Sequence, residues 1–301
     1  MSSGTDGEAA AIATRSPSLR TDDGSFAAAI GRIPLPVAHT LAGEELLWPA
    51  AAKSLAQAVP PGWVTYHGAV LPTIMPSGGP PKLDRGVDEV FDELSQICAS
   101  VRIYHLQHRD PYRGLVHGCL DEVEPLVGTT EGGMRERDAS LFVGSPGAVV
   151  PAHFDRHHNV LLQITGSKDV FVGMFRDAAV GHEEIESQAG TGINHLHTLP
   201  EHVQVFHLEP GDGVYLPPYA FHWVEGREGV SVALSCSFST EMSERTELVN
   251  RCNRRLRRIG MRPNPAGSGP ARDATKAAVI RSWRALRRRP GRWSAAADRR
   301  A

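Results

Sequence analysis

The middle of the chain, from residue 140 to residue 240, alternates between short apolar runs and turns rich in Gly and Pro. Runs of this length that end at turn residues are typical of β-strands, and many of them in succession favour a sandwich or a barrel. The pattern therefore predicts a mainly β core, with strands at residues 141–143, 149–154, 160–165, 170–174, 203–208, 214–216 and 230–238.

The segments before this core are less regular. Residues 1–25 are small and polar and predict disorder. Residues 32–85 contain many prolines and predict an irregular cover over the core. Residues 87–101 carry apolar side chains at helical spacing, residues 101–107 predict a strand, and residues 118–138 predict helix and loop. Together they form an expected N-terminal α/β cover.

After Thr240 the pattern becomes helical. Apolar side chains recur near one stripe of residues 242–259, a Pro- and Gly-rich linker follows at 261–270, and a second helix is predicted over 272–288. Because 301 residues suffice for one sizeable core, we expect three parts: a disordered N-terminus (1–25), one core domain (26–240) and a helical extension (241–301).

Charge is distributed unevenly along the chain, although the net charge is only -2. Residues 251–301 hold 16 Lys and Arg against 2 acidic residues, whereas the first 250 residues hold 16 basic and 32 acidic residues. A basic helical extension beside an acidic body has an electrostatic partner in that body or in a second subunit. We therefore expect a homodimer through these helices, and we do not expect binding to nucleic acid.

Cysteine usage and hydropathy bear on the compartment. The four cysteines are scattered without metal-binding or disulfide spacing, no apolar run approaches the length of about 18 residues that spans a bilayer, and the N-terminal residues do not resemble a signal peptide. These observations predict a reducing, cytoplasmic setting without membrane contact.

A His-Phe-Asp triplet is the first sign of chemistry. His153 and Asp155 are two residues apart in a predicted strand, so their side chains point the same way and can share one ion. His222 lies in a second strand-like segment, after a Pro-Pro-Tyr turn. Two imidazoles and one carboxylate on one side of a metal form a facial triad, which suits Fe(II) and leaves positions open for other ligands.

Lys168 follows the triplet in another strand-like run. The residues expected on its face are Val170, Val172 and Met174, so the lysine needs an anion if it is buried. The far carboxylate of 2-oxoglutarate would supply one. The alternative is a lysine at the start of the strand that extends to solvent.

In these motifs the chain resembles the JmjC or cupin-like family of Fe(II)- and 2-oxoglutarate-dependent hydroxylases, especially its asparaginyl-hydroxylase-like branch. The resemblance covers about residues 100–240. It runs through Arg102-Ile-Tyr104, Pro-Ala-His153-Phe-Asp155, Asn159, Gly-Ser-Lys168, Pro-Gly-Asp212, Tyr-Leu-Pro-Pro-Tyr219 and His222. It implies a double-stranded β-helix, or jelly roll, for the core domain, with Fe(II) as cofactor and 2-oxoglutarate and O2 as cosubstrates.

The resemblance also implies roles for single residues. His153, Asp155 and His222 would bind the iron, Lys168 and the Tyr104 hydroxyl would contact 2-oxoglutarate, and the Asn159 side chain would lie near it. Two positions differ from the family pattern. Val150 stands where a threonine often binds the cosubstrate, and Ser235 stands where some relatives have an asparagine. We interpret both as changes that retune the cosubstrate site.

Two alternatives stay open at this point. His195, His197 and Glu201 have the spacing of the small metal-binding cupins and could combine with His222, although the preceding residues are loop-like. His157 and His158 are expected at the entrance or the surface.

The predicted function is hydroxylation of a C–H bond in a peptidyl, amino-acid or small-metabolite substrate. The sequence does not distinguish this from demethylation, which begins with the same hydroxylation. The alternative is a non-enzymatic cupin that binds a metal or ligand and engages a partner through its basic tail.

Overall fold

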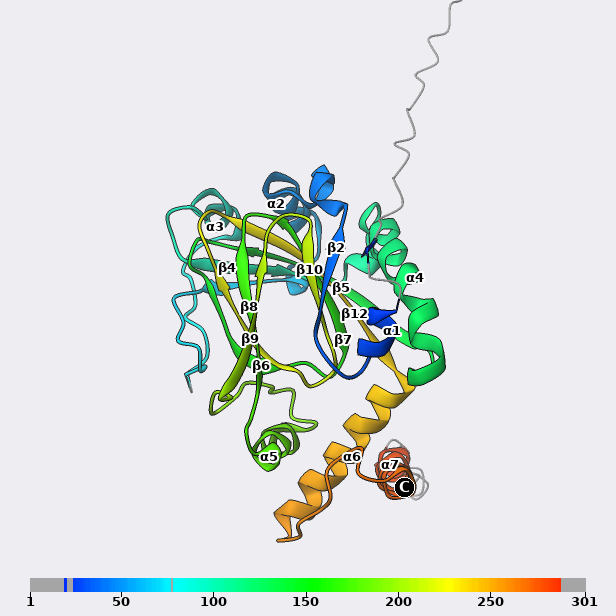
Figure 1. The fold of residues 1–301 in the computed structure, drawn as a ribbon. Helices are drawn as coiled ribbons and strands as arrows, with labels where there is room; N and C mark the ends of the chain where they lie inside the picture. The colour runs from blue at the N-terminus through cyan, green and yellow to red at the C-terminus, as the bar shows by residue number, and fades with distance from the viewer. Residues whose placement is uncertain (1–18, 21–23, 77, 288–301) are drawn as a thin grey trace, which may run out of the picture.

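The computed structural model describes residues 19–20, 24–76 and 78–287. Two antiparallel sheets face each other (Figure 1). The larger has the order β1 (Leu19–Arg20), β2 (Leu35–His39), β10 (Asp212–Leu216), β7 (His158–Thr165), β12 (Ser231–Thr240), β5 (Met134–Gly144), β4 (Ala99–Ile103), β3 (Val64–Gly68). The smaller has the order β6 (Val149–Phe154), β11 (Phe221–Gly226), β8 (Lys168–Met174), β9 (His202–Leu208). The mainly β, jelly-roll prediction is confirmed.

The central strands are apolar on both faces because each face meets a different layer. In β12, Leu234 and Phe238 belong to the large core cluster that extends to the helices, whereas Ala233 packs between the two sheets. Ser235 is on the same face as Ala233, since strand side chains alternate with a period of two. The interior of the sandwich therefore receives a polar side chain from a strand that is otherwise buried.

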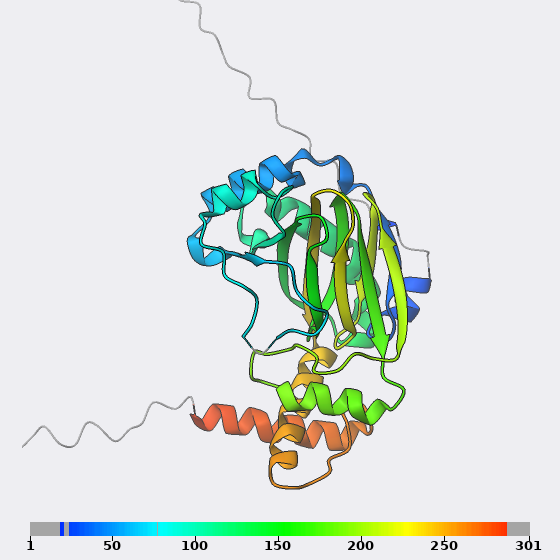
Figure 2. The same ribbon diagram turned by 90° about the vertical axis from the view of Figure 1, so that its left-hand side faces the viewer.

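Helices cover the outer face of the larger sheet and one end of the sandwich. Before the core lie α1 (Ser25–Ala29), α2 (Pro49–Ala58), α3 (Val87–Asp92) and α4 (Tyr112–Glu131), and after or within it α5 (Ala178–Gln188), α6 (Glu241–Arg258) and α7 (Pro270–Arg287). Single 3-10 turns occupy Leu41–Gly43, Glu45–Leu47, Pro61–Trp63 and Leu106–His108. Helices α5, α6 and α7 gather at one end of the sandwich (Figures 1 and 2).

The start of α6 is fixed by the strand that precedes it. Thr240, the last residue of β12, accepts a hydrogen bond from the Ser243 amide, and the Ser243 hydroxyl accepts one from the Thr240 amide. This reciprocal cap satisfies backbone donors that a helix N-terminus leaves free. The helical extension therefore begins directly at the end of a central strand.

No helix in the described ranges is long and apolar enough to cross a bilayer.

Several element predictions were wrong in the N-terminal part. The segment 32–85 contributes β2 and β3 to the larger sheet as well as helix α2. The helix predicted over 87–101 ends at Asp92. The strand β4 begins at Ala99, because its backbone forms hydrogen bonds with the neighbouring strands β3 and β5. Most of the segment 1–25, predicted to be disordered, lies outside the described residues, and Leu19–Arg20 pair with β2.

Candidate functional site

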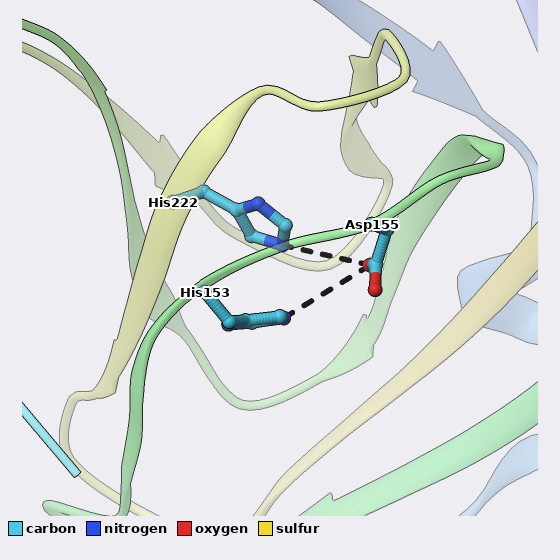
Figure 3. A group of neighbouring side chains, drawn as sticks. All are labelled: His153, Asp155 and His222. Atoms are coloured by element: carbon cyan, nitrogen blue, oxygen red, sulfur yellow. Dashed lines mark ion pairs between the residues drawn. The ribbon is translucent and has the colours of Figure 1, made fainter. Parts of the chain in front are cut away.

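The three residues of the predicted facial triad come together at one edge of the smaller sheet. His153 of β6 and His222 of β11 are directly paired across the two strands, and a register irregularity follows His222. Asp155 comes just after β6, and its Oδ2 atom lies 3.9 Å from the Nε2 atom of each histidine (Figure 3). The ligand atoms all lie within 4.8 Å of one another, and no other group of three such residues does so in the described part of the chain.

Backbone contacts fix the orientation of both imidazoles. The Nδ1 atom of His153 is 2.8 Å from the Pro151 carbonyl oxygen, and that of His222 is 2.9 Å from the Ala220 carbonyl oxygen. A carbonyl oxygen only accepts, so Nδ1 carries the proton and donates in each ring. Each Nε2 therefore faces Asp155 and is the ring nitrogen available to a metal.

Two residues hold the Asp155 segment in place. The Asn194 side chain donates to the Phe154 carbonyl (2.8 Å) and to Asp155 Oδ1 (3.3 Å). The Tyr219 amide donates to the Asp155 carbonyl (2.6 Å), with Tyr219 in the left-handed region at φ 65°. The second carboxylate oxygen, Oδ2, is left facing the histidines.

The protonation states match metal binding. Burial and the neighbouring His222 lower the pKa of His153 to about 4, so its ring is neutral near pH 7. Burial alone would raise the pKa of Asp155, but the adjacent His153 and His222 and the Arg102 guanidinium hold it below its usual value. The site therefore presents a neutral imidazole from His153 and an ionised carboxylate from Asp155, with the His222 ring beside them.

Lys168 enters the same cavity from the first position of β8. It is 7% exposed, and no hydrogen bond or ion pair reaches its ammonium from the residues that the structure describes. Burial lowers its pKa to about 8. A buried ammonium without an anion is unfavourable, so the geometry argues for a ligand carboxylate. The alternative, in which Lys168 extends to solvent, is therefore excluded. Of the three residues expected on its face, Val170 and Val172 are buried, whereas Met174, at the end of β8, is 69% exposed.

The other predicted contacts also line this cavity, whose volume is about 280 Å³. The Ser235 hydroxyl donates to the Asn159 side-chain oxygen at 2.8 Å, which joins β12 to β7. Val150 and Tyr104 are further lining residues. The Tyr104 hydroxyl is 3.1 Å from that of Thr65. The cavity thus brings together every residue predicted to contact metal or cosubstrate.

Sequence reasoning assigned no role in this cavity to Arg102 or Asn194, and it named His195 only in the alternative metal set. Arg102 stood inside the matched motif Arg102-Ile-Tyr104, and its alternation with Tyr104 along a strand could have indicated a shared face. His195 forms an isolated bridge with His153, although its segment is a loop. Asn194 carried no signal, because only the fold brings it to Asp155.

The alternative cupin set is wrong. His195 lines the cavity, but the His197 side chain is 72% exposed and lies 2.8 Å from Glu184, and Glu201 accepts from the Arg176 amide. The prediction for His158 is also wrong. Its side chain is fully buried, 2.8 Å from the Tyr215 hydroxyl and stacked on Phe238. β7 begins at His158, so its side chain turns into the core.

The donor set and the cavity suit the implied ligands. Two imidazoles and one carboxylate on one side leave further coordination positions, as in non-haem Fe(II) oxygenases. An unpaired ammonium in the same cavity suits the far carboxylate of 2-oxoglutarate.

Comparison with known proteins agrees with this architecture. Residues 133–248, from the start of β5 into α6, match the family model of the JmjC domain. An X-ray structure of E. coli ycfD aligns with a TM-score of 0.50 at 17% identity, covering 92% of this chain and 70% of that chain. A structure of YcfD described as a ribosomal oxygenase from Escherichia coli aligns with a TM-score of 0.48 at 16% identity, covering 92% and 69%.

A structure of the same Escherichia coli protein in complex with cobalt and 2-oxoglutarate gives a TM-score of 0.48 at 16% identity, covering 91% of this chain and 69% of that chain. At these identities the likeness concerns the fold. No curated protein matches this sequence.

Proposed function

Because residues 133–248 match the family model of the JmjC domain, we propose that this protein is an Fe(II)- and 2-oxoglutarate-dependent oxygenase that hydroxylates a C–H bond. In the balanced reaction, substrate C–H, O2 and 2-oxoglutarate give substrate C–OH, succinate and CO2. The single observation that carries the proposal is the convergence of His153, Asp155 and His222 in a cavity that also holds the unpaired ammonium of Lys168.

Each of these residues has a defined task. When bound, the iron and 2-oxoglutarate supply the oxidising chemistry, while the protein provides orientation and a shielded site. His153, Asp155 and His222 hold the metal from one side, and Asn194 keeps the carboxylate directed at it. Lys168 binds the far carboxylate of 2-oxoglutarate, because no anion among the described residues is paired with its ammonium.

Tyr104, Asn159 and Ser235 complete the proposed cosubstrate site. All three line the cavity, and the hydrogen bond from Ser235 to Asn159 holds the amide of Asn159 in one orientation. Ser235 thus supports this amide, although it is shorter than an asparagine. Tyr104 directly follows β4 of the same larger sheet, and its hydroxyl also contacts Thr65.

Anaerobic binding followed by a turnover assay tests the function. Fe(II) or Mn(II) and 2-oxoglutarate should bind together to the full-length protein, and succinate should form in air with candidate peptidyl, amino-acid or small-metabolite substrates. A protein that binds the metal but neither binds nor consumes 2-oxoglutarate would contradict the proposal and would favour a non-enzymatic cupin.

We further propose a homodimer through α6 and α7. The two helices pack on each other through Leu248, Cys252, Ala277 and Ile280. On α7, Val279 and Leu286 are 55% and 63% exposed, and an apolar stripe on a helix is normally covered. Sedimentation velocity should give a dimer that becomes monomeric when residues 241–301 are removed. A monomeric full-length protein would contradict it.

We also propose that the protein does not bind nucleic acid and that it is cytoplasmic. Arg251 and Arg257 of α6 pair with Glu247, Glu183 and Glu186, so part of the basic charge is neutralised within the protein. The four cysteines are free, as in a reducing, cytoplasmic setting. Binding to RNA or DNA at physiological salt would contradict the first point.

A further inference from the structure

The cavity holds more positive charge than the proposed cosubstrate uses. Among its described lining residues, Asp155 is the only acidic side chain, whereas Lys168 and Arg102 are both cationic. Asp155 faces the metal, and 2-oxoglutarate would give its keto-acid end to the metal and its far carboxylate to Lys168. Arg102 acts on Asp155 only through space and forms no ion pair with any described residue, so no anion is paired with its guanidinium.

Arg102 is held rigidly in this position. Its guanidinium carbon lies 4.4 Å from the centre of the Tyr104 ring and 4.7 Å from that of Phe142. Both distances are within the range of cation–π contacts, which fix the plane of the guanidinium. Its orientation therefore does not depend on a ligand.

The guanidinium keeps most of its donors free. One terminal nitrogen, Nη2, donates to the Ser140 hydroxyl at 3.3 Å. The Nε–H group is buried and has no hydrogen-bond partner among the described residues. An arginine has five N–H donors in a planar fork that matches a carboxylate. An unsatisfied buried donor is unfavourable, so the site as it stands calls for an acceptor.

Arg102 lies on a different wall from Lys168. It belongs to β4, where it is paired with Thr65 of the edge strand β3, and Thr65 is exposed while lining the same cavity. Lys168 belongs to the opposite sheet and is almost fully buried. The wall that carries Arg102 thus reaches solvent, from which a substrate enters.

Resting on the proposed function, we infer that Arg102 binds a carboxylate of the substrate. The substrate class is then a carboxylic acid whose reacting C–H group and carboxylate fit together inside the cavity. A cavity of about 280 Å³ lies just below the usual range for ligand sites, which is about 300–1,000 Å³. With 2-oxoglutarate present it admits a small acid such as an amino acid, or one acidic side chain of a peptide.

The first test asks which ligand Arg102 serves. In full-length protein loaded with Mn(II) without oxygen, 2-oxoglutarate affinity is measured for Arg102→Gln, Arg102→Lys and Lys168→Met. The matched control is Arg113→Gln, at an exposed position on α4. We expect Arg102→Gln to change the 2-oxoglutarate Kd by less than about threefold, and Lys168→Met to raise it by roughly 30-fold or more. Equal losses in the two variants would place Arg102 in the cosubstrate site and overturn the inference.

The second test uses pairs of acids and their primary amides as probes. Free L-amino acids, propionate, glutarate and short peptides with Asp or Glu are each compared with the matched amide. Binding to the Mn(II)- and 2-oxoglutarate-loaded protein is followed by the spin-resonance spectrum of the metal, and turnover by succinate release. We expect selective binding of acids, a loss of roughly 30-fold or more in Arg102→Gln, and partial recovery in Arg102→Lys.

The arms of this experiment separate the sources of the carboxylate. Stimulation by free acids indicates a small-molecule substrate, and stimulation by acidic peptides alone indicates a side chain; both support the inference. Equal binding of acids and amides, or binding of neither, would overturn it. Failure of the proposed function is distinguishable, because it would abolish 2-oxoglutarate binding in the unmodified protein as well.

Discussion

His153 of β6 and His222 of β11 occupy directly paired positions of two antiparallel strands, and their ring centroids lie 4.1 Å apart. Both rings donate from Nδ1 to a carbonyl two residues earlier in their own strand or turn. The two nitrogen ligands are therefore positioned by a sheet rather than by flexible loops. A site built on rigid elements and supported by hydrogen bonds is preorganised for its ligand.

Removal of any one of these ligands should abolish metal binding. Loss of a hydrogen-bond partner of a metal ligand typically weakens metal affinity 10- to 100-fold. Loss of a ligand itself should cost more, so we expect His153→Ala, Asp155→Ala or His222→Ala to raise the metal Kd by more than about 100-fold. Isothermal titration with Mn(II) measures this. His197→Ala serves as the control and should stay within about twofold of the unmodified protein. Loss of Mn(II) affinity in His197→Ala, with affinity kept in the three ligand variants, would point to a metal site at His195 and His197.

Lys168→Ala should weaken 2-oxoglutarate binding while the metal stays bound. Removing one member of a buried charge pair costs about 2–5 kcal/mol, which corresponds to at least about 30-fold in Kd. Tyr104→Phe should act in the same direction but less strongly, because a single neutral hydrogen bond contributes about 0.5–1.5 kcal/mol. Unchanged 2-oxoglutarate affinity in Lys168→Ala would be incompatible with the proposed site.

The affinity for 2-oxoglutarate should decrease as the pH rises above about 8. Burial lowers the pKa of Lys168 from 10.5 to about 8 in the free protein. A bound carboxylate favours the ammonium and raises this pKa, so binding takes up a proton above pH 8 and weakens by up to about tenfold per pH unit. Kd values between pH 7 and 9.5 check the slope. Lys168→Arg should remove it, since a guanidinium stays charged.

Val150→Thr should strengthen 2-oxoglutarate binding. Val150 lines the cavity, next to Pro151 in the sequence. A threonine hydroxyl at position 150 can donate a hydrogen bond to the cosubstrate. One added hydrogen bond should lower Kd by about 2- to 12-fold. Val149→Thr, whose side chain points to the other face of β6, is the control. Weaker binding in Val150→Thr would mean that the valine fills space which the hydroxyl cannot use.

Glu186→Ala should destabilise the contact between α5 and α6. Glu186 is 1% exposed, accepts from Asn253 at 2.6 Å and pairs with Arg257. Its loss removes the buried partner of Arg257, which keeps only the exposed Glu183, and takes one acceptor from the Asn253 amide. We expect about 3 kcal/mol less unfolding free energy, at the lower end for buried pairs because Arg257 is 28% exposed. Urea unfolding measures it. Glu183→Ala, at the exposed end of the same arginine, should cost less than about 1 kcal/mol.

Local pattern was sufficient for the parts of the fold and site that depend on near neighbours. The run at 149–154 coincides with β6, and the other runs of the core became β5, β7, β8, β9, β10 and β12 with shifted ends. His153 and Asp155 share a side because they are two apart along the chain. The single lysine in an apolar strand indicated a buried anion site, because burial of a lone charge is unfavourable.

Only the tertiary structure decided what depends on distant partners. The proline-rich segment became β2 and β3 because β10 and β4 supply its hydrogen bonds. Asn194 and Arg102 reach the cavity from a loop and from a strand outside the smaller sheet, and His158 is buried by contacts with Tyr215 and Phe238. Sequence periodicity reports which side of a strand a residue occupies, whereas the layer on that side is set by long-range strand pairing.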